Sequence, residues 1–366
     1  MPTENKVRME LTGSGKSTLP WEVGGFFSAI EPSREERVAW PQPNVFFGLA
    51  RHVVPGILRV NQSVRRLWIP SYFCPDVAGY WSSIIETVRY RDDPSLPEPD
   101  WKSLQADQHD LVMAVNFFGV RDKEPWERWR SSHDCVLLED HTHDPVSSWA
   151  LASHADYAFS SLRKSMPITD GAICWSPTGL RLPRPEGKTN EVAIEWKLAA
   201  MMAKADFLAG KTSAELKEHY RELYARGDRC LEEGPESPIS DGAFRHASPG
   251  VPTRWRWMRE RNVRTLFHSI KEKPEAKPLF RHWPTKSVPF AMVLVFSSGR
   301  ERDSCRAYLE ANHVFCPIHW PSSRAEAMTD LPERILSIPA DQRYDDADMA
   351  RVAKILEQWN PVGRHG

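Results

Sequence analysis

The chain has 366 residues, of which 48 are Lys or Arg and 49 are Asp or Glu, so its formal net charge is −1. This balance gives no electrostatic reason to expect a nucleic acid as a partner. The longest apolar run, near residues 288–296, is far shorter than the roughly 20 residues of a membrane-spanning helix, so we expect no membrane insertion. Six cysteines without CxxC spacing are typical of reduced thiols, which favours a cytoplasmic location.

The first segment is polar and rich in Gly and Ser, which predicts a disordered tail over residues 1–20. It contains GSGKST at 13–18, the second half of a phosphate-binding loop. The full motif requires a glycine five positions before Gly15, where Glu10 stands, and no strand precedes it. We therefore expect no nucleotide site there. Ordered structure is predicted from Glu22, where EVGGFF begins.

Between residues 44 and 175 the sequence turns to short apolar runs separated by helical stretches. Spacings of roughly 20–25 residues between several of these runs suit βα units in one mostly parallel sheet. A helix is expected from Phe47 through Leu58. The expected strands are 67–70, 88–90, 111–115, 136–138, 157–159 and 173–175.

The C-terminal half is richer in helices. The pattern predicts long helices at 191–208 and 213–225, and a polar loop with a domain junction at 227–250. A helix beginning near Thr253, a strand at 290–296, and helices at 300–311 and 349–359 follow. Helices and strands in this order favour a large domain over 21–235 and a smaller α/β domain over 236–366.

The stretch from Cys135 to Ala172 carries the most chemistry. A short apolar run ends in Glu139-Asp140, and a second predicted strand leads through two serines and an arginine to Lys164. Open α/β sheets bind ligands at the carboxyl ends of their strands. A lysine can form a Schiff base with an aldehyde cofactor, and a carboxylate can keep a pyridine nitrogen protonated. Asp140 and Lys164 therefore suit pyridoxal phosphate (PLP) chemistry.

These motifs also carry a family resemblance. ED-x-x-H after a strand, followed by S-S-L-R-K-x-x-P-x-x-D-G-A, resembles the DegT/StrS-type sugar aminotransferases of PLP fold type I, and more closely a divergent branch with a recurring SLRK…PDGA segment. The resemblance covers nearly the whole chain from Glu22. It continues through IPSYFCPDV at 69–77, VNFFG at 115–119, IHWP at 318–321 and IPADQRYDDADM at 338–349. It implies a large domain with a mostly parallel sheet, a smaller C-terminal α/β domain, and PLP as the cofactor.

The resemblance also assigns roles to the two central residues and their neighbours. Lys164 would bond the cofactor covalently and move protons as general base and acid, and Asp140 would pair with the pyridinium nitrogen. His143 matches a position near the phenolic oxygen of the cofactor, although a buried histidine satisfied by the backbone is the alternative. Ser160, Ser161, Gly48 and Leu49 are candidates for the cofactor phosphate, with an ordinary buried helix start as the alternative for the last two.

The turn at 71–75 should supply the side chain that stacks on the cofactor ring. Counting from the proline places the usual aromatic position on Cys74, with Tyr72 and Phe73 beside it. Asn116 and Arg163 are candidate substrate residues, and Arg163 alternatively holds phosphate or lies on the surface. His319-Trp320 and Arg343-Tyr344 are interpreted as structural.

A metal site is not expected. His141 and His143 lie close to Cys135 and Asp140, but no second cluster with zinc-like spacing accompanies them.

The leading hypothesis is thus a PLP-dependent aminotransferase acting on a small molecule in a biosynthetic pathway. By resemblance, its acceptor would be a keto sugar nucleotide or a related keto compound, and its donor glutamate. A PLP-dependent lyase, racemase or bond-forming enzyme, and a non-catalytic scaffold or regulatory protein, are the alternatives. A homodimer with shared active sites is expected from the resemblance; fifteen Trp and fifteen Phe agree with an aromatic-rich interface.

Overall fold

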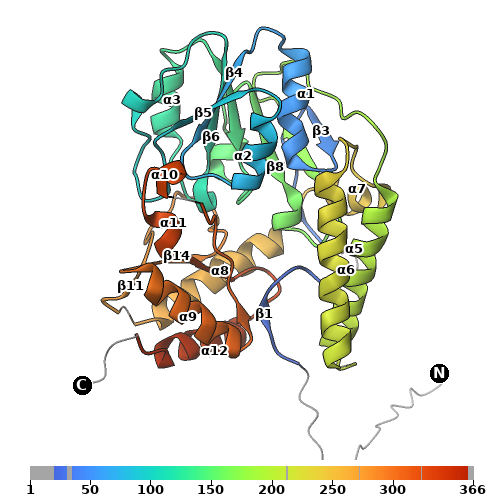
Figure 1. Ribbon diagram of the computed structural model, residues 1–366, viewed down its shortest axis with the longest axis vertical. Helices are drawn as coiled ribbons and strands as arrows, with labels where there is room; N and C mark the ends of the chain where they lie inside the picture. Colours follow the sequence, from blue (N-terminus) through green and yellow to red (C-terminus); the bar gives the residue numbers. More distant parts are fainter. Residues whose placement is uncertain (1–19, 31–34, 212, 272, 323, 362–366) are drawn as a thin grey trace, which may run out of the picture.

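The computed structural model describes residues 20–30, 35–211, 213–271, 273–322 and 324–361. Residues 1–19 of the predicted tail, with the GSGKST segment, therefore lie outside the described residues. Two units are stacked in Figure 1, a large sheet with its helices above and a smaller α/β unit below.

The large unit contains a seven-stranded sheet in the order β3-β9-β8-β7-β6-β4-β5. The strands β5, β4, β6, β7 and β8 pair in parallel, whereas β9 and β3 join antiparallel at the other edge. The six strands predicted for this region are confirmed as β4 (Arg66–Pro70), β5 (Glu86–Tyr90), β6 (Asp110–Val115), β7 (Val136–Asp140), β8 (Tyr157–Ser161) and β9 (Ala172–Trp175). The strand β3 (Asn44–Phe47) was not predicted. The helix expected from Phe47 begins only at Ala50, because Phe47 is the last residue of β3 and pairs with Ala172 of β9.

Both faces of this sheet are covered, which is why its strands read as continuous apolar runs. The short helix η1 (Ala50–His52), α1 (Val53–Val60) and α2 (Pro75–Ser82) pack on one face. The other face holds the tryptophans of α3 (Glu124–Arg130) and α4 (Ser148–Leu151). The short helices η2 (Trp101–Ser103), η3 (Phe117–Gly119) and η4 (Leu162–Lys164) lie in the connections.

Two long helices, α5 (Glu191–Leu208) and α6 (Ala214–Glu233), run side by side along one edge of the molecule (Figure 1). The side chains of Asn190 and Ser213 cap their first turns. The prediction of a loop from 227 was wrong, because α6 continues through Glu233. Gly227 is helical there, and a Cβ at this position would overlap Lys197 Cγ and lie 3.1 Å from the carbonyl oxygen of Ala193. The glycine thus permits close helix packing rather than ending the helix.

The next segment packs with the large unit. The helix α7 (Asp241–Ala247) and Val251 join the cluster around Trp40, and β10 (Val251–Pro252) pairs with β2 (Arg37–Val38). Residues 238–252 therefore pack with the large sheet.

The small unit is built on a three-stranded antiparallel sheet of β11 (Ala276–Pro278), β12 (Met292–Phe296) and β14 (Ile335–Ile338). Its core is enclosed by α8, α9 and α12. The N-terminal β1 (Val23–Gly24) belongs to this unit and pairs in parallel with β13 (Val314–Phe315). The helices are α8 (Thr253–Ser269), α9 (Gly299–Ala311), α10 (Arg324–Ala327), α11 (Leu331–Arg334) and α12 (Asp346–Gln358). Among the described residues, no helix is both long and apolar enough to span a membrane.

Candidate active site

The ends of two neighbouring parallel strands bring the central pair to one edge of the sheet. Asp140 is the last residue of β7 and stands opposite Phe159 on β8. Lys164 is the last residue of η4, which follows β8 directly. Side chains alternate along a strand, so Asp140 shares the sheet face of Leu138 and Phe159, the face covered by α1 and α2. The loop after β8 therefore starts beside Asp140.

Asp140 is buried, and its Oδ1 accepts a hydrogen bond of 2.8 Å from the Thr142 N–H. In the part of the chain that the structure describes, no Lys or Arg forms an ion pair with it. Burial raises the pKa of this carboxyl, against the hydrogen bonds from Thr142. Asp140 is therefore a buried carboxyl whose charged form a nearby cation would stabilise.

Lys164 projects into a cavity of about 460 Å³ between the two units, and its side chain is exposed there. Removal of bulk water by the surrounding protein, followed by repulsion from Arg163, lowers the pKa of Lys164. A lower pKa increases the fraction of neutral amine, which is the nucleophilic form. Further basic side chains at the cavity are Arg163, Arg221, Arg306 and Arg343, and aromatic ones are Phe26, Phe27, Tyr224, Phe290 and Phe315.

His143 is held in a stack of aromatic rings. Its ring lies 4.5 Å from that of Phe290 and 5.7 Å from that of Trp320, centroid to centroid, at small interplanar angles. Burial, then the charges of His319 and Lys164, lower its pKa well below the usual value, so the ring is neutral. Nδ1 accepts a 3.0 Å hydrogen bond from the Phe118 N–H, which places the ring proton on Nε2. His143 therefore presents one N–H donor.

The turn after β4 directs the three candidates for stacking on the cofactor ring into different surroundings. Tyr72 packs its buried ring against Phe117 and Trp320, and Phe73 stacks on Trp81. Cys74, the N-cap of α2, is only partly buried and lies within electrostatic range of Lys164. The turn thus commits the two aromatic rings to the core, and Cys74 is the one of the three whose thiol interacts electrostatically with Lys164.

The alternation of β8 also separates the two serines. Ser161 shares the face of Asp140, and its N–H donates to Thr142 Oγ1 at 3.1 Å. Ser160 points to the opposite face, where its buried Oγ has no hydrogen-bond partner. Ser161 is therefore the serine on the side of the central pair.

The other phosphate candidates are engaged elsewhere. The Gly48 N–H donates to the Ser237 carbonyl at 2.8 Å, and the Gly171 N–H donates to the Gly48 carbonyl at 2.7 Å. The Leu49 side chain is buried against α5 and α6. The first helical turn begins after them, at Ala50.

The two predicted substrate residues differ in position. Arg163 lines the cavity and donates to Asp228 Oδ1 at 2.8 Å. Asn116 is buried and satisfied internally, because its Oδ1 accepts from the Arg121 N–H at 3.0 Å and its Nδ2 donates to Ser147 Oγ at 3.2 Å. Only Arg163 of the two faces the cavity of Lys164.

Several residues at or near the cavity carried no functional signal in the sequence. Tyr224 of α6 lines the cavity. Asp228, one turn further along α6, bridges Arg163 to the buried Lys197. His319, which was interpreted as structural, faces the cavity. Burial, and then the charge of Lys164, lower the pKa of His319 to about 3. Its Nδ1 lies 2.9 Å from Ser337 Oγ. Among the described residues, no group of three or more His, Cys, Asp or Glu is arranged to hold a metal ion.

No protein-family model matches the sequence, and no curated protein matches it. Solved structures do match. Spr1654 of Streptococcus pneumoniae, assigned as a sugar aminotransferase and solved in its PLP form, superposes with a TM-score of 0.59 at 12% identity over 92% of this chain and 98% of its own. The fold is that of a PLP fold type I aminotransferase.

Two further neighbours agree. A DegT/DnrJ/EryC1/StrS aminotransferase from Brucella abortus gives a TM-score of 0.55 at 13% identity, over 86% of this chain and 85% of its own. DesI, solved in the presence of its TDP-sugar product, superposes with a TM-score of 0.56 at 13% identity, over 86% of this chain and 80% of its own. The expected fold class is thus confirmed, and the structural neighbours are sugar aminotransferases of the resembled family. At these identities the likeness establishes the fold alone.

Proposed function

We propose that this chain is a PLP-dependent aminotransferase in which Lys164 and Asp140 are the catalytic residues. The observation that carries the proposal is their placement in this fold. Asp140 ends one strand, Lys164 follows its parallel neighbour, and the aspartate is buried without a cationic partner.

The residues present fit PLP. A buried carboxylate without a counter-ion is unfavourable, and a protonated pyridine nitrogen would supply the missing positive charge. When bound, PLP supplies an electron sink that stabilises negative charge at the substrate carbon next to the nitrogen. Asp140 maintains that capacity by keeping the ring nitrogen protonated.

The lowered pKa of Lys164 serves two tasks. The neutral amine is the form of Lys164 that would hold the aldehyde group of PLP covalently. Lys164 Nζ would also be the group at the cavity that takes a proton from the substrate carbon as general base and returns one as general acid.

Three further residues would orient the cofactor. His143 would donate its Nε2–H to the phenolic oxygen, since Nδ1 is already an acceptor. Ser161 would bind the phosphate, and Cys74 would lie against the ring in the place of the usual aromatic side chain. Gly48 and Leu49 are weaker phosphate candidates because the Gly48 N–H is occupied.

We propose the substrates by analogy with the structural neighbours. DesI was solved with a TDP-sugar, and a keto sugar nucleotide or related keto compound is accordingly our proposed acceptor, with glutamate as donor. We also propose a cytoplasmic homodimer. Arg163, fixed by Asp228 at the cavity, is positioned to attract an anionic group of either substrate.

Amino transfer is tested with one half-reaction. The protein is loaded with PLP and mixed with L-glutamate, and 2-oxoglutarate and the amine form of the cofactor are measured. Both should appear in equal amounts in the wild type and in Lys102→Ala, which changes an exposed lysine, and neither should appear in Lys164→Ala. Loaded protein that binds PLP but gives neither product would exclude transamination from this donor.

A further inference from the structure

The N-terminal segment 22–27 forms a thin wall on one side of the candidate active site. Gly24, Gly25, Phe26 and Phe27 line the cavity of Lys164. The opposite side of the same segment lines a second cavity of about 380 Å³. Gly24 and Phe27 border both cavities, so the wall is one chain thick there.

Arg343 holds this wall through its guanidinium group. Nε and Nη2 donate to the two carboxylate oxygens of Asp341, each at 2.8 Å. Nη1 points to three successive carbonyl oxygens, at 3.4, 3.2 and 3.1 Å, which belong to Gly24, Gly25 and Phe26. A fork of fixed donors can bind a carboxylate on one side and a row of carbonyls on the other, which an ammonium group cannot do.

Other contacts fix the wall at both ends. The Gly24 N–H donates to the Tyr344 hydroxyl at 2.7 Å. Lys204 forms an ion pair with Glu22 at 3.0 Å and donates to the Phe26 carbonyl at 2.8 Å. Gly24 has φ +96°, and a Cβ there would overlap the Phe315 carbonyl. The wall thus lies too close to β13 for a side chain at this position.

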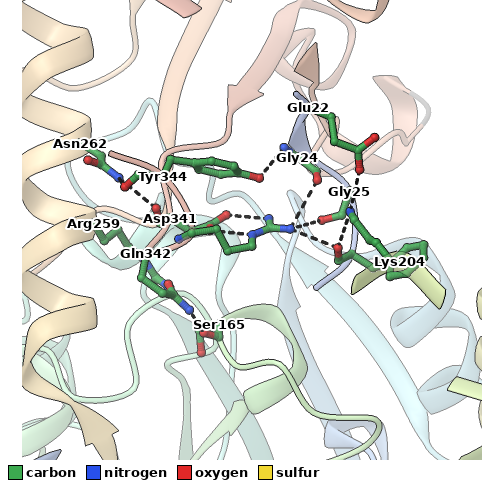
Figure 2. Close-up of polar contacts among 12 residues, drawn as sticks. Glu22, Gly24, Gly25, Ser165, Lys204, Arg259, Asn262, Asp341, Gln342 and Tyr344 are labelled. Atoms are coloured by element: carbon green, nitrogen blue, oxygen red, sulfur yellow. Dashed lines mark hydrogen bonds and ion pairs between the residues drawn. The ribbon is translucent and has the colours of Figure 1, made fainter. Parts of the chain in front are cut away.

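The residue between Asp341 and Arg343 reaches the catalytic loop. Gln342 Nε2 donates at 2.7 Å to the carbonyl of Ser165, the neighbour of Lys164, and its Oε1 accepts from Arg259 at 2.9 Å. Asn262 on α8 donates to the carbonyls of Asp341 and Tyr344, both at 2.9 Å. Figure 2 shows these contacts as one network between the wall, α8 and the lysine loop.

We propose that residues 341–343 are a positioning unit that holds segment 22–27 in register with Lys164, and that this segment is a substrate-contacting wall whose Phe26 and Phe27 restrict what can bind. The proposal rests on the proposed function for its substrate. Arg343 is a positioning residue and not a substrate ligand, because each of its three side-chain nitrogens already donates to an oxygen of Asp341 or of segment 22–27. Releasing the wall removes one side of the substrate site but leaves the Asp140–Lys164 pair in place.

Arg343→Lys tests this proposal because it keeps the positive charge and loses the fork. We expect the KM for L-glutamate to rise about tenfold, with kcat changed less than about threefold, and a protease to cut within 20–30 faster than in the wild type. The control is Arg264→Lys, which changes a surface arginine paired with Glu260 on α8. It should alter neither quantity.

If Arg343→Lys does not fold, Phe26→Ala tests whether segment 22–27 contacts the substrate, because it removes one aromatic ring of the segment and leaves Arg343 in place. It should raise the same KM. Unchanged KM and unchanged cleavage in Arg343→Lys, or a fall in kcat with KM constant, would overturn the positioning role. If the wild type takes up no PLP, the proposed function fails. The rate of protease cleavage within 20–30, compared between Arg343→Lys and the wild type, then tests whether Arg343 holds the wall.

Discussion

Asp140 is buried, which disfavours its charged form, although its proposed role requires the carboxylate. Burial raises its pKa in the folded chain above the value in the unfolded chain. A carboxyl with a raised folded pKa favours folding while it is protonated, and this stabilisation is lost as the pH rises through the folded pKa. Without a cationic partner, the ionised Asp140 therefore opposes folding at neutral pH, and a bound cation would reverse this effect.

The first prediction follows for Asp140→Asn. The amide keeps an acceptor for the Thr142 N–H but carries no charge, so the cofactor-free variant should melt at a higher temperature than the wild type at pH 8, with a smaller difference at pH 5. Turnover of the loaded variant should fall by roughly 10²–10³-fold, as for the loss of one preorganised electrostatic partner. Thermal melts at the two pH values and the glutamate half-reaction measure both effects. A variant less stable than the wild type at pH 8 would contradict this account of the carboxylate.

The second prediction concerns Arg163, whose positive charge contributes to the lowered pKa of Lys164. Arg163→Gln removes that charge and leaves Asp228 less neutralised, and both changes raise the pKa of Lys164. The pH dependence of PLP attachment should move to higher pH, since less neutral amine is present at a given pH. Borohydride trapping across a pH series gives the midpoint, with Arg163→Lys as the charge-retaining control. An unshifted midpoint would show that Arg163 does not influence the lysine.

At the scale of elements, the sheet was predictable because its strands are buried on both faces and therefore appear as uninterrupted apolar runs. The loop predicted at 227–250 from its polar composition with Gly and Pro was wrong at its start, because Gly227 lies inside α6 and permits contact between α5 and α6. The pairing of β10 with β2 was not predicted, because β2 lies more than 200 residues earlier, as Pro252 opposite Arg37 shows. Pairing across such a separation leaves no local signal.

The third prediction tests that interpretation of Gly227. Gly227→Ala should destabilise the protein by about 1–3 kcal/mol, because a methyl group would overlap Lys197 and approach the backbone of Ala193. Gly242→Ala is the matched control, since it is also helical and a Cβ there would meet nothing within 4 Å. That change should be neutral or stabilise by up to about 1 kcal/mol. Equal effects of the two substitutions in urea denaturation would refute the close-packing role.

At the scale of the site, the sequence named Asp140, Lys164, His143 and Arg163, because each belongs to a short motif after a predicted strand. It could not determine which of Tyr72, Phe73 and Cys74 faces the lysine, since one turn can direct neighbouring side chains in opposite directions. The wall at 22–27 and its anchor at Arg343 were also beyond prediction. They lie more than 300 residues apart in the chain and meet only in the folded molecule.

For the whole molecule, the fourth prediction is a homodimer. The composition and the family resemblance support it. Light scattering at micromolar concentration should give twice the chain mass of 41.9 kDa. A mass of one chain, with full cofactor occupancy and activity, would contradict shared active sites.

The claim on which this account depends is that Lys164 holds the cofactor. Protein incubated with PLP, reduced with borohydride and digested should yield one modified peptide, and mass spectrometry should place the pyridoxyl group on Lys164. Lys164→Ala treated in the same way should yield none. Modification of another lysine in the wild type at equal occupancy, or continued specific labelling of Lys164→Ala, would contradict the assignment.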